Sequence, residues 1–583
     1  MRINIIRVLI IAVFLLILMN LFYLQVIRGR YFYRLSHNNS IRVIPFEGER
    51  GKILDRNGKV LAESEKAYHA VIIPQDMGKR RDVFGFLSGC LGEPSEEIER
   101  RYRRNKLTPF SPVSVAEGIT RQQAIKIEEN SFRFPGLMVI ERYRRKYSLA
   151  KAGAHALGYV GKVDPARMRE IASYGYSAED VIGYSGIEQG YDDVLRAATG
   201  GREIEVNSRG QQTRLLQIRE STKGRDVMLT LDAFIQRVAQ DALGGARGSV
   251  VILDPDTGEI LAMASSPSFD PNAFTHREER NRVAEYLEDS ASPLLNRAIT
   301  GSFPPGSVFK IPVAIAGLEE KKITPFTSFN CPGYFELGDR IFKSPHVWGI
   351  QDLTQAMGHS ANEYFFHVGL LLGPEMIERY ARLMGLGQRT GIDLPYEAKG
   401  RIPSRVDHLR WFKGDTVNMS IGQGNVLTTP LQLARMIAVF ANGGYLVTPR
   451  IVKNVDGAEL CVGADTDRLL NGRESRVMCG ASKVRIMFRE DTWKILQKVL
   501  YAPVRMETGT AHILDLPGLD TFGKTGTAQA GAGKMDHAWF VGVTASSKRR
   551  IAYSFFFENG GSSANACAAM KEILLRLQEK GVL

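Results

Sequence analysis

The residues whose types and spacing most clearly suggest chemistry are Ser307 and Lys310. They lie in the stretch 303–310 (FPPGSVFK), which leads into an apolar segment ending near Leu318. On a helix, side chains three positions apart share a face and lie roughly 5–6 Å apart at Cβ. The Lys310 amine is therefore expected to reach the Ser307 hydroxyl. A hydroxyl beside an amine base is one way to make a nucleophile at neutral pH.

The pattern Ser-x-x-Lys is weak by itself, because about two or three copies arise by chance in a chain of this length at ordinary residue frequencies. A second copy is Ser148 to Lys151, in a polar and basic stretch that indicates a surface turn. The segment after Ser307 is instead apolar on nearly every face, which is typical of a buried helix. A buried lysine must find a partner or lose its proton.

Two further motifs follow Ser307 in the chain. The first is Ser360-Ala361-Asn362, ahead of an apolar helix, where capping of that helix is the simpler alternative. Ser-x-Asn also occurs at Ser36 and at Ser563, where it opens the C-terminal helix. A serine acyl-transfer site needs a nucleophile, a base, a proton relay and an oxyanion hole, and Ser360 is a candidate relay.

The second is the motif Lys524-Thr525-Gly526-Thr527, placed at the end of a strand covering 519–523. Gly526 would let a substrate backbone pair closely with the strand edge, because it has no side chain. Lys524 brings a cation, and Thr527 offers a hydroxyl and a backbone N–H. An ordinary strand end is the alternative for this motif taken alone.

The three motifs in this order are the set typical of penicillin-interactive serine enzymes. The chain resembles the class B penicillin-binding proteins, and the resemblance covers nearly all of it. It is most similar to the elongation type, penicillin-binding protein 2. The stretches that carry this likeness include 50–62, 132–136, 186–188, 205–207, 253–267, 391–395, 421–424, 537–542 and 558–561.

The resemblance implies a monofunctional peptidoglycan D,D-transpeptidase that cross-links stem peptides through a serine acyl-enzyme and releases D-Ala. It implies Ser307 as nucleophile, Lys310 as base, Ser360 as proton relay and Asn362 as a ligand of the substrate amide and of Lys310. It assigns Lys524, Thr525, Gly526 and Thr527 to the substrate, with Lys524 and Thr527 on the terminal carboxylate. The backbone N–H groups of Ser307 and Thr527 would form the oxyanion hole, and β-lactams would acylate Ser307.

Physical chemistry adds a condition to this assignment, because Lys310 must be neutral to act as a base. Burial and the nearby positive charge of Lys524 should both lower the pKa of Lys310. Two other readings stay open: a D,D-carboxypeptidase or β-lactamase on the same fold, and a catalytically inactive cell-wall scaffold. Slow loss of the acyl group would separate a transpeptidase from a β-lactamase.

The first 27 residues predict a short cytoplasmic N-terminus and a single transmembrane anchor. Val8 to Leu24 carries no charge, and such a run is about 26 Å long as a helix, enough to cross a bilayer with little tilt. No small-residue cleavage site follows it, which disfavours a signal peptide. We expect the rest of the chain on the periplasmic side of the inner membrane, although the flanking arginines do not orient the anchor clearly.

The charge of +13 is spread over scattered or short basic runs. No nucleic-acid motif accompanies these runs, so nucleic acid is not an expected partner. Anionic lipid or an acidic partner suits them better, and a basic solvated surface is the plain alternative. Nothing in the chain resembles the glycosyltransferase domain of class A relatives. The resemblance therefore implies a SEDS-type glycosyltransferase and other elongation-complex proteins as partners.

The pattern of strands and helices predicts an α+β fold with three parts. These are the anchor (1–27), an elongated, mixed and non-catalytic pedestal of the dimerisation type (28–225), and a transpeptidase domain (226–583) with a central antiparallel sheet flanked by helices. A hairpin is expected at 50–62, strands near 248–254 and 259–264, and three more at 521–528, 537–543 and 550–557. Strands at both ends with helices between them indicate one sheet assembled from distant segments.

No cofactor is expected. Some elongation-type relatives bind zinc near the second motif, and Cys331, Asp339 and His346 are weak candidates for such a site. Ser344 and Ala361 stand where a thiol would be expected, so we favour ordinary loop residues. His537 is expected to be structural. Five cysteines are too few for a disulfide scaffold, and whether Cys461 and Cys479 form a disulfide is left open.

Overall fold

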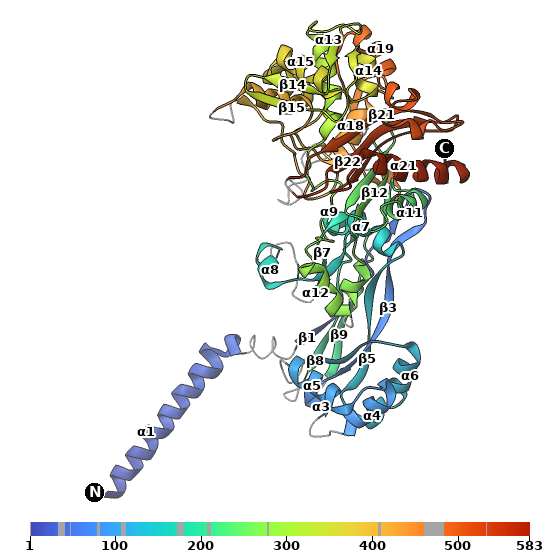
Figure 1. Ribbon diagram of the computed structural model, residues 1–583. Helices are drawn as coiled ribbons and strands as arrows, with labels where there is room; N and C mark the ends of the chain where they lie inside the picture. Colours follow the sequence, from blue (N-terminus) through green and yellow to red (C-terminus); the bar gives the residue numbers. More distant parts are fainter. Residues whose placement is uncertain are drawn as a thin grey trace. The chain divides into compact units, whose positions relative to one another are not determined.

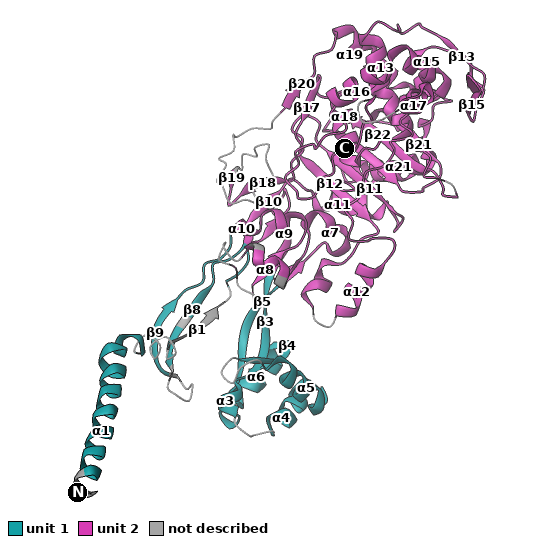
Figure 2. Ribbon diagram, turned by 90° about the vertical axis from the view of Figure 1, so that its left-hand side faces the viewer, with its two compact units in different colours: residues 1–50, 64–144, 196–224 teal, residues 51–63, 145–195, 225–583 magenta. Residues whose placement is uncertain are grey.

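The computed structural model (Figure 1) describes the chain except residues 1, 33–40, 47, 78–81, 107–111, 172–175, 177–179, 207–211, 277–278, 406–409, 460–482 and 532. Cys461, Cys479, Asn207 and Ser36 therefore lie outside the described residues. The described chain forms two compact units (Figure 2). Unit 1 is Met1–Arg50, Ser64–Arg144 and Arg196–Gly224, and unit 2 is Gly51–Glu63, Arg145–Leu195 and Arg225–Leu583. The units are not continuous in sequence, and the domain boundaries at 27 and 225 stay a prediction.

Unit 1 begins with the helix α1 (Arg2–Phe22), which continues as the π-helical turn η1 (Tyr23–Ile27). Residues Ile5–Ile27 are long and apolar enough to cross a membrane, with a mean hydropathy of 2.8. The described side chains of this segment are exposed along its whole length. Since apolar side chains exposed on every face need an apolar surrounding, this helix is compatible with the expected membrane anchor.

The rest of unit 1 is a mixed α+β structure with its own small core. A three-stranded antiparallel sheet has the order β1 (Ile41–Phe46), β8 (Gly200–Val206), β9 (Gln212–Arg219). In a second group of strands, β3 (Val60–Ile72) pairs with β4 (Val113–Ile119) and with β5 (Leu137–Tyr147). Buried side chains of the helices pack against β4, among them Phe84, Leu87 and Ile98. The helices are α3 (Pro74–Met77), α4 (Asp82–Leu91), α5 (Ser95–Asn105) and α6 (Arg121–Glu129).

Unit 2 is built on a five-stranded antiparallel sheet, as the sequence predicts. Its order is β12 (Ile260–Ser266), β11 (Gly248–Leu253), β23 (Arg550–Phe557), β22 (His537–Ala545), β21 (Asp520–Ala528). The two N-terminal strands thus join the three C-terminal strands, and β21 stands at one edge. The motif beginning at Lys524 lies inside β21, which confirms the predicted strand at 521–528 and makes the prediction of a strand end at 523 wrong. Thr525, Gly526 and Thr527 stay paired in register with β22.

Successive side chains along the strands of this sheet pack in two different hydrophobic cores. Val250 and Ile252 pack in the core that contains α21 (Ser563–Glu579) and α11 (Ala233–Asp241), whereas Val251 and Leu253 point into the larger core of the helical layer. This division follows from the two-residue period of a strand. Helices α13 (Lys310–Glu319) and α18 (Pro430–Ala438) belong to the larger core. The sheet is therefore covered on both faces, which places α13 and its first residue, Lys310, deep in the unit.

Further helices complete the layer around α13. They are α14 (Leu353–Gly358), α15 (Asn362–Leu372), α16 (Pro374–Leu383), α17 (Lys413–Ser420), α19 (Glu490–Val499) and α20 (Ala502–Arg505). Small antiparallel pairs lie among them: β13 (Phe329–Cys331) with β16 (Gly349–Gln351), β14 (Tyr334–Leu337) with β15 (Arg340–Lys343), and β17 (Tyr445–Val447) with β20 (Lys483–Arg485). The helical character predicted for 300–500 is confirmed.

Residues 51–63, 145–195 and 225–230 form another part of unit 2. The predicted hairpin is confirmed: β2 (Ile53–Leu54) pairs with the start of β3, and Ile53 lies opposite Ala62. β2 also pairs with β10 (Val227–Leu229), which pairs with β18 (Val452–Val455), next to β19 (Ala458–Glu459). Other elements of this part are α7 (Ala154–Leu157), β6 (Val160–Lys162), α8 (Pro165–Ile171), β7 (Val181–Gly183), α9 (Gly186–Gly190) and α10 (Asp192–Leu195). The helix α12 (Arg280–Glu288) also belongs to unit 2.

A buried ion pair fixes this part of unit 2. Arg145 Nε donates to Glu188 Oε1 at 2.7 Å, and Arg145 Nη1 donates to the carbonyl of Gly51 at 2.7 Å. Both charged side chains are almost fully excluded from solvent. Burying two charges is favourable only when they are paired and hydrogen-bonded. The segment 186–188, which the sequence marks by family likeness alone, therefore has a structural reason for its glutamate.

Candidate active site

Ser307 lies where the backbone closely approaches the end of β21. It lies in the 3₁₀-helix η7 (Gly306–Phe309), which runs directly into α13. Gly306 has φ +54°, and a Cβ on it would lie 2.5 Å from the carbonyl oxygen of Thr527. The Gly306 N–H donates to the carbonyl of Gly422 at 3.1 Å. Only glycine tolerates both this φ and this closeness, so η7 is held between the end of β21 and the loop at Gly422.

The 3₁₀ geometry also explains the spacing of the first motif. Side chains three apart eclipse each other in a 3₁₀-helix, so Ser307 and Lys310 lie on the same side. Ser307 is half-buried, and Lys310 is completely buried. The expectation of an α-helical turn at Ser307 is corrected to a 3₁₀ turn, with α13 beginning at Lys310.

The Lys310 amine joins the first motif to the second. Nζ donates to the carbonyl oxygen of Ser360 at 2.7 Å and to Oδ1 of Asn362 at 2.7 Å, and the Ser360 Oγ lies 3.3 Å from it. The expected contact between Asn362 and Lys310 is confirmed. Among the described residues no hydrogen bond joins Lys310 Nζ to Ser307 Oγ, and catalytic hydrogen bonds often tighten only when substrate binds.

The surroundings of Lys310 favour the neutral amine. Burial first, and then the charge of Lys524, lowers the pKa of Lys310 well below its ordinary value of 10.5, against smaller opposite effects of Glu363 and Cys331. A neutral amine has two N–H groups and one lone pair. In the neutral form the two short bonds to carbonyl oxygens use the two N–H groups, and the lone pair can accept a hydroxyl proton. The pKa of Lys310 is thus shifted in the direction that a base requires.

Ser360 stands at a helix junction in an uncommon conformation. Its φ is +59°, in the left-handed region that a residue with a side chain adopts at a cost of about 1–3 kcal/mol. The N–H of Ala361 donates to the carbonyl of Ala356 at 2.9 Å, the bond of a Schellman turn that ends α14. The residue that precedes α15 as its N-cap is Ala361, with no side-chain cap bond. The capping alternative for Ser360 is wrong.

The third motif runs along the edge strand β21. Lys524 is completely buried, and burial lowers its pKa to about 7. Its Nζ donates to the carbonyl oxygen of Thr525 at 3.3 Å and lies 3.5 Å from the Thr525 hydroxyl. Near neutral pH the charge of Lys524 is therefore only partly present, whereas the sequence argument takes it as a full cation. Thr527 is exposed, as a residue that meets substrate should be.

Thr525 and Gly526 have structural duties besides any contact with substrate. The Thr525 side chain is buried and donates to the Thr510 Oγ1 at 2.7 Å. A Cβ on Gly526 would lie 2.6 Å from the carbonyl oxygen of Pro305 and 3.0 Å from a methyl of Val308. Gly526 is thus required by the approach of η7. The free edge of β21 still allows the substrate pairing that the sequence predicts.

The remaining predictions from sequence concern residues outside the three motifs. The structure does not bring Cys331, Asp339 and His346 together, and the described residues contain no group of three His, Cys, Asp or Glu side chains able to hold a metal ion. Burial and Glu363 raise the pKa of the Cys331 thiol to about 11. His537 is buried and its Nδ1 accepts the N–H of Asn559 at 3.1 Å, a structural role.

The repeated short patterns are resolved by their contacts. Ser148 is exposed and donates to the carbonyl of Val60 at 2.8 Å, in a turn before the 3₁₀-helix at Lys151. At the C-terminal helix the capping residue is Ser562, whose Oγ accepts the N–H of Ala564. The cap is thus one residue earlier than the Ser563 pattern suggests. Neither copy belongs to the candidate site.

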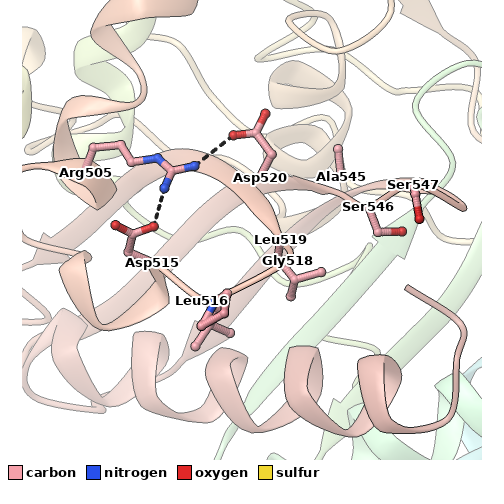
Figure 3. A pocket seen from close by; sticks show the side chains of 10 residues that line it. Arg505, Asp515, Leu516, Gly518, Leu519, Asp520, Ala545, Ser546 and Ser547 are labelled. Atoms are coloured by element: carbon pink, nitrogen blue, oxygen red, sulfur yellow. Dashed lines mark hydrogen bonds and ion pairs between the residues drawn. The ribbon is translucent and has the colours of Figure 1, made fainter.

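A separate cavity of about 630 Å³ lies at the other end of β21 (Figure 3). Arg505 crosses it, forming an ion pair with Asp520 at 3.0 Å and another with Asp515. Asp520 begins β21, whereas Thr527 is near its end. None of the three motif segments contributes to its lining, which comprises Arg505, Asp515 to Asp520 and Ala545 to Ser547.

Sequence reasoning missed the residues that support the second motif. His359, Thr508 and Thr510 form hydrogen bonds around the turn that carries Ser360. No spacing pattern in the sequence predicts these residues, because they come together only through the tertiary fold. The only indication in the sequence is that Thr508 and Thr510 lie shortly before Lys524 of the third motif.

Comparison with known proteins identifies two matching families and several similar relatives. The model of the penicillin binding protein transpeptidase domain matches residues 248–576, and that of the penicillin-binding protein dimerisation domain matches residues 45–229. A protein of Acinetobacter baumannii named peptidoglycan D,D-transpeptidase MrdA is 32% identical, over 94% of this chain and 83% of the relative.

Two solved structures are similar over most of the chain. One, described as structural coordination of polymerization and crosslinking by a peptidoglycan synthase complex, is 30% identical with a TM-score of 0.73, covering 98% of this chain and 97% of the other. The second is PBP2 of Helicobacter pylori in a complex with MreC, 25% identical with a TM-score of 0.78, covering 93% of this chain and all of the other.

Proposed function

Because this chain belongs to the family of the class B penicillin-binding proteins, and to its penicillin-binding protein 2 type, we propose that it is a peptidoglycan D,D-transpeptidase with Ser307 as its nucleophile. The reaction joins two stem peptides in cell-wall synthesis during elongation. The observation that carries the proposal is the buried Lys310 amine three residues after Ser307, which donates to the Ser360 carbonyl and to Asn362 Oδ1 and so joins the first motif to the second.

In the acylation step the Ser307 Oγ attacks the carbonyl carbon of the penultimate D-Ala. Lys310 takes the hydroxyl proton, the bond between carbon and the terminal D-Ala nitrogen breaks, and D-Ala leaves as an amine after it receives a proton. Ser360 is the relay for that proton, since its Oγ lies 3.3 Å from Lys310 Nζ. The product is an ester between Ser307 and the stem peptide.

In the second step an amine of a neighbouring stem peptide attacks that ester. The amine loses a proton toward Lys310, the ester bond breaks, and the Ser307 hydroxyl is restored. A β-lactam enters the first step in the same way. Its ring amide opens, but the amine that is released stays attached to the acyl group. It therefore remains in the site and hinders the second step.

Lys524 and Thr527 bind the terminal carboxylate of the substrate, with Thr525 beside them on the same strand. The backbone N–H groups of Ser307 and Thr527 stabilise the negative oxygen of the tetrahedral intermediate. Support for this pairing comes from the closeness of Gly306 to the Thr527 carbonyl, which brings the start of η7 beside the end of β21.

The helix Ile5–Ile27 anchors the chain in the cell membrane as a single span, with the rest of the chain on the outer, periplasmic side. Substrate is found on that side. A SEDS-type glycosyltransferase in the membrane is its partner for polymerisation. Relatives described as part of a peptidoglycan synthase complex and as a complex with MreC support partners of the elongation machinery.

A labelling experiment tests the nucleophile. The full chain in detergent is incubated with a fluorescent penicillin, and covalent label is read on a denaturing gel. Wild type should be labelled and Ser307→Ala should not be. Ser148→Ala is the matched control, since it removes the serine of the same four-residue pattern at an exposed turn, and it should keep full labelling. Undiminished labelling of Ser307→Ala would overturn the assignment, and rapid loss of the label from wild type would indicate a β-lactamase.

A further inference from the structure

The turn that carries Ser360 is fastened to the strand that carries Lys524. Gly358, two residues before Ser360, accepts hydrogen bonds at its carbonyl from the N–H of Thr510 at 3.2 Å and from the Thr510 Oγ1 at 3.4 Å. The Thr510 Oγ1 in turn accepts from the Thr525 hydroxyl at 2.7 Å. The path between the second and third motifs therefore runs through one threonine outside both.

The hydrogen bonds along this path are all donated in one direction, from β21 toward the turn at Gly358. Lys524 Nζ lies within reach of the Thr525 Oγ1, Thr525 donates to Thr510, and Thr510 donates to the Gly358 carbonyl. Hydroxyl groups in such a chain polarise one another, which strengthens each bond. A change in the hydrogen bonding of Thr525 should therefore alter the hydrogen bond that Thr510 donates to the Gly358 carbonyl.

A second fastener acts on the residue directly before Ser360. The His359 ring stacks on Trp348, with centroids 4.1 Å apart and an angle of 3° between planes. Its Nδ1 is 2.6 Å from Gln351 Oε1 and its Nε2 is 2.8 Å from the Thr508 Oγ1. The ring is held at both nitrogens and on one face.

The tautomer of His359 follows from its neighbours. Gln351 uses its amide nitrogen to donate to the carbonyls of Trp348 and Ile350, so its oxygen faces His359 and must accept. Nδ1 therefore carries the proton, and Nε2 accepts from the Thr508 hydroxyl. Burial lowers the pKa of His359, which is consistent with this neutral ring.

These contacts explain how a serine can occupy the left-handed position 360. The position after a helix end is usually glycine, because a side chain is strained there. At φ +59° Ser360 presents its carbonyl and its hydroxyl to the same amine, Lys310. A glycine would supply only the carbonyl. The strained serine persists because its surroundings hold it.

We propose that Thr510 and His359 are positioning residues that hold Ser360 in its left-handed conformation and couple it to the substrate-binding strand. This proposal rests on the proposed function, since it gives Ser360 a part in acylation. Both residues act through Ser360 in this proposal. Their effect is on the rate constant of acylation, through the placement of Ser360 at Lys310, and not on the initial binding of the β-lactam.

The central test compares Thr510→Val with Thr510→Ser. Acylation by a fluorescent penicillin is followed in time at several concentrations, which separates the dissociation constant of the first complex from the acylation rate constant. Valine removes the hydroxyl at nearly the same volume, and we expect the rate constant to fall about tenfold, the equivalent of one hydrogen bond of about 1.4 kcal/mol. Serine restores the hydroxyl and should stay within about twofold of wild type, by the same measure.

Thr521→Val is the matched control. Thr521 lies on β21 and is buried, and like Thr510 it pairs its hydroxyl with that of another threonine, Thr544, at 3.0 Å. The variant removes a hydroxyl pair of the same kind from the strand that carries Thr525, away from Ser360. Its melting temperature should fall, whereas its acylation rate constant should not change. A general loosening of the sheet would slow both valine variants equally.

Thr508→Val tests the second fastener at an exposed position, where loss of folding is not a concern. We expect a severalfold lower acylation rate constant with an unchanged melting temperature. Wild-type rate constants in Thr510→Val, or equal slowing in Thr510→Ser and Thr510→Val, would overturn the coupling through Thr510. A wild-type rate constant in Thr508→Val would overturn the role of His359. Complete final labelling of every variant would show that the nucleophile itself is intact, and no labelling of wild type would instead refute the proposed function.

Discussion

Replacing Lys524 by methionine should make unit 2 more stable while it removes acylation. Burial lowers the pKa of Lys524 from its ordinary 10.5 to about 7. Each pKa unit corresponds to about 1.4 kcal/mol of free energy. The folded state therefore loses on the order of 4 kcal/mol at pH 7 by keeping this lysine. Methionine has a similar length and carries no charge, so Lys524→Met should recover most of that free energy.

The sign and pH range of the effect follow from linkage. The unfolded chain holds the Lys524 proton up to about pH 10.5, and the folded chain releases it near pH 7. The penalty is complete below about pH 7 and shrinks as pH rises from there toward 10.5. The melting temperature of Lys524→Met should thus exceed that of wild type by about 4–5 °C at pH 7, for a unit of this size, and by clearly less at pH 9.

Calorimetry of the full chain in detergent at pH 6, 7, 8 and 9 measures this difference, and penicillin labelling of the same samples measures acylation. A difference that is constant across pH would assign the gain to packing. A lower melting temperature of the variant at every pH would contradict the explanation, because it would show that Lys524 stabilises the fold.

Three further changes probe the site and its support. Ser360→Gly keeps the left-handed backbone and the carbonyl that Lys310 uses, so labelling kinetics should show acylation slowed about 10²-fold or more, while the melting temperature should not fall, because glycine is not strained at this φ; a wild-type rate would exclude the hydroxyl relay. Gly306→Ala places a Cβ 2.5 Å from the Thr527 carbonyl at a positive φ, so both the melting temperature and the acylation rate should fall, and normal kinetics would contradict a tight crossing. Glu188→Ala leaves the buried charge of Arg145 without its carboxylate, so chemical denaturation should show a loss of about 3–5 kcal/mol; a loss below about 1 kcal/mol would mean that water replaces the carboxylate.

The fold was predictable where local patterns are strong. The Asn-Gly turn of the hairpin at 50–62, the two N-terminal strands and the three C-terminal strands of the sheet all follow from alternation and turn residues. Their membership of one sheet was predicted from strands at both ends of the segment with helices between them, whereas their order is set by the long-range pairing of β11 with β23. The compact units were not predictable, because residues 51–63 and 145–195 join unit 2 through long-range pairing that leaves no trace in local sequence.

The site shows the same division between sequence and tertiary structure. The sequence by itself determined which side chains are present and in which order, and Ser307, Lys310, Ser360 and Lys524 were enough to propose serine acyl transfer. It also predicted that Lys310 lies in an apolar helix and is buried, which the structure confirms. These conclusions rest on residue type and short spacing, which are local properties.

Only the tertiary structure decided what those residues do to one another. It set Lys310 between two carbonyl acceptors, put Ser360 in a left-handed turn rather than a helix cap, and turned the Thr525 hydroxyl toward Thr510. It also confirmed the prediction that Ser148 lies in an exposed turn, unlike Ser307. The physical reason is that burial, charge proximity and strain depend on segments far apart in the chain, and those segments meet only when the sheet and its helices are assembled.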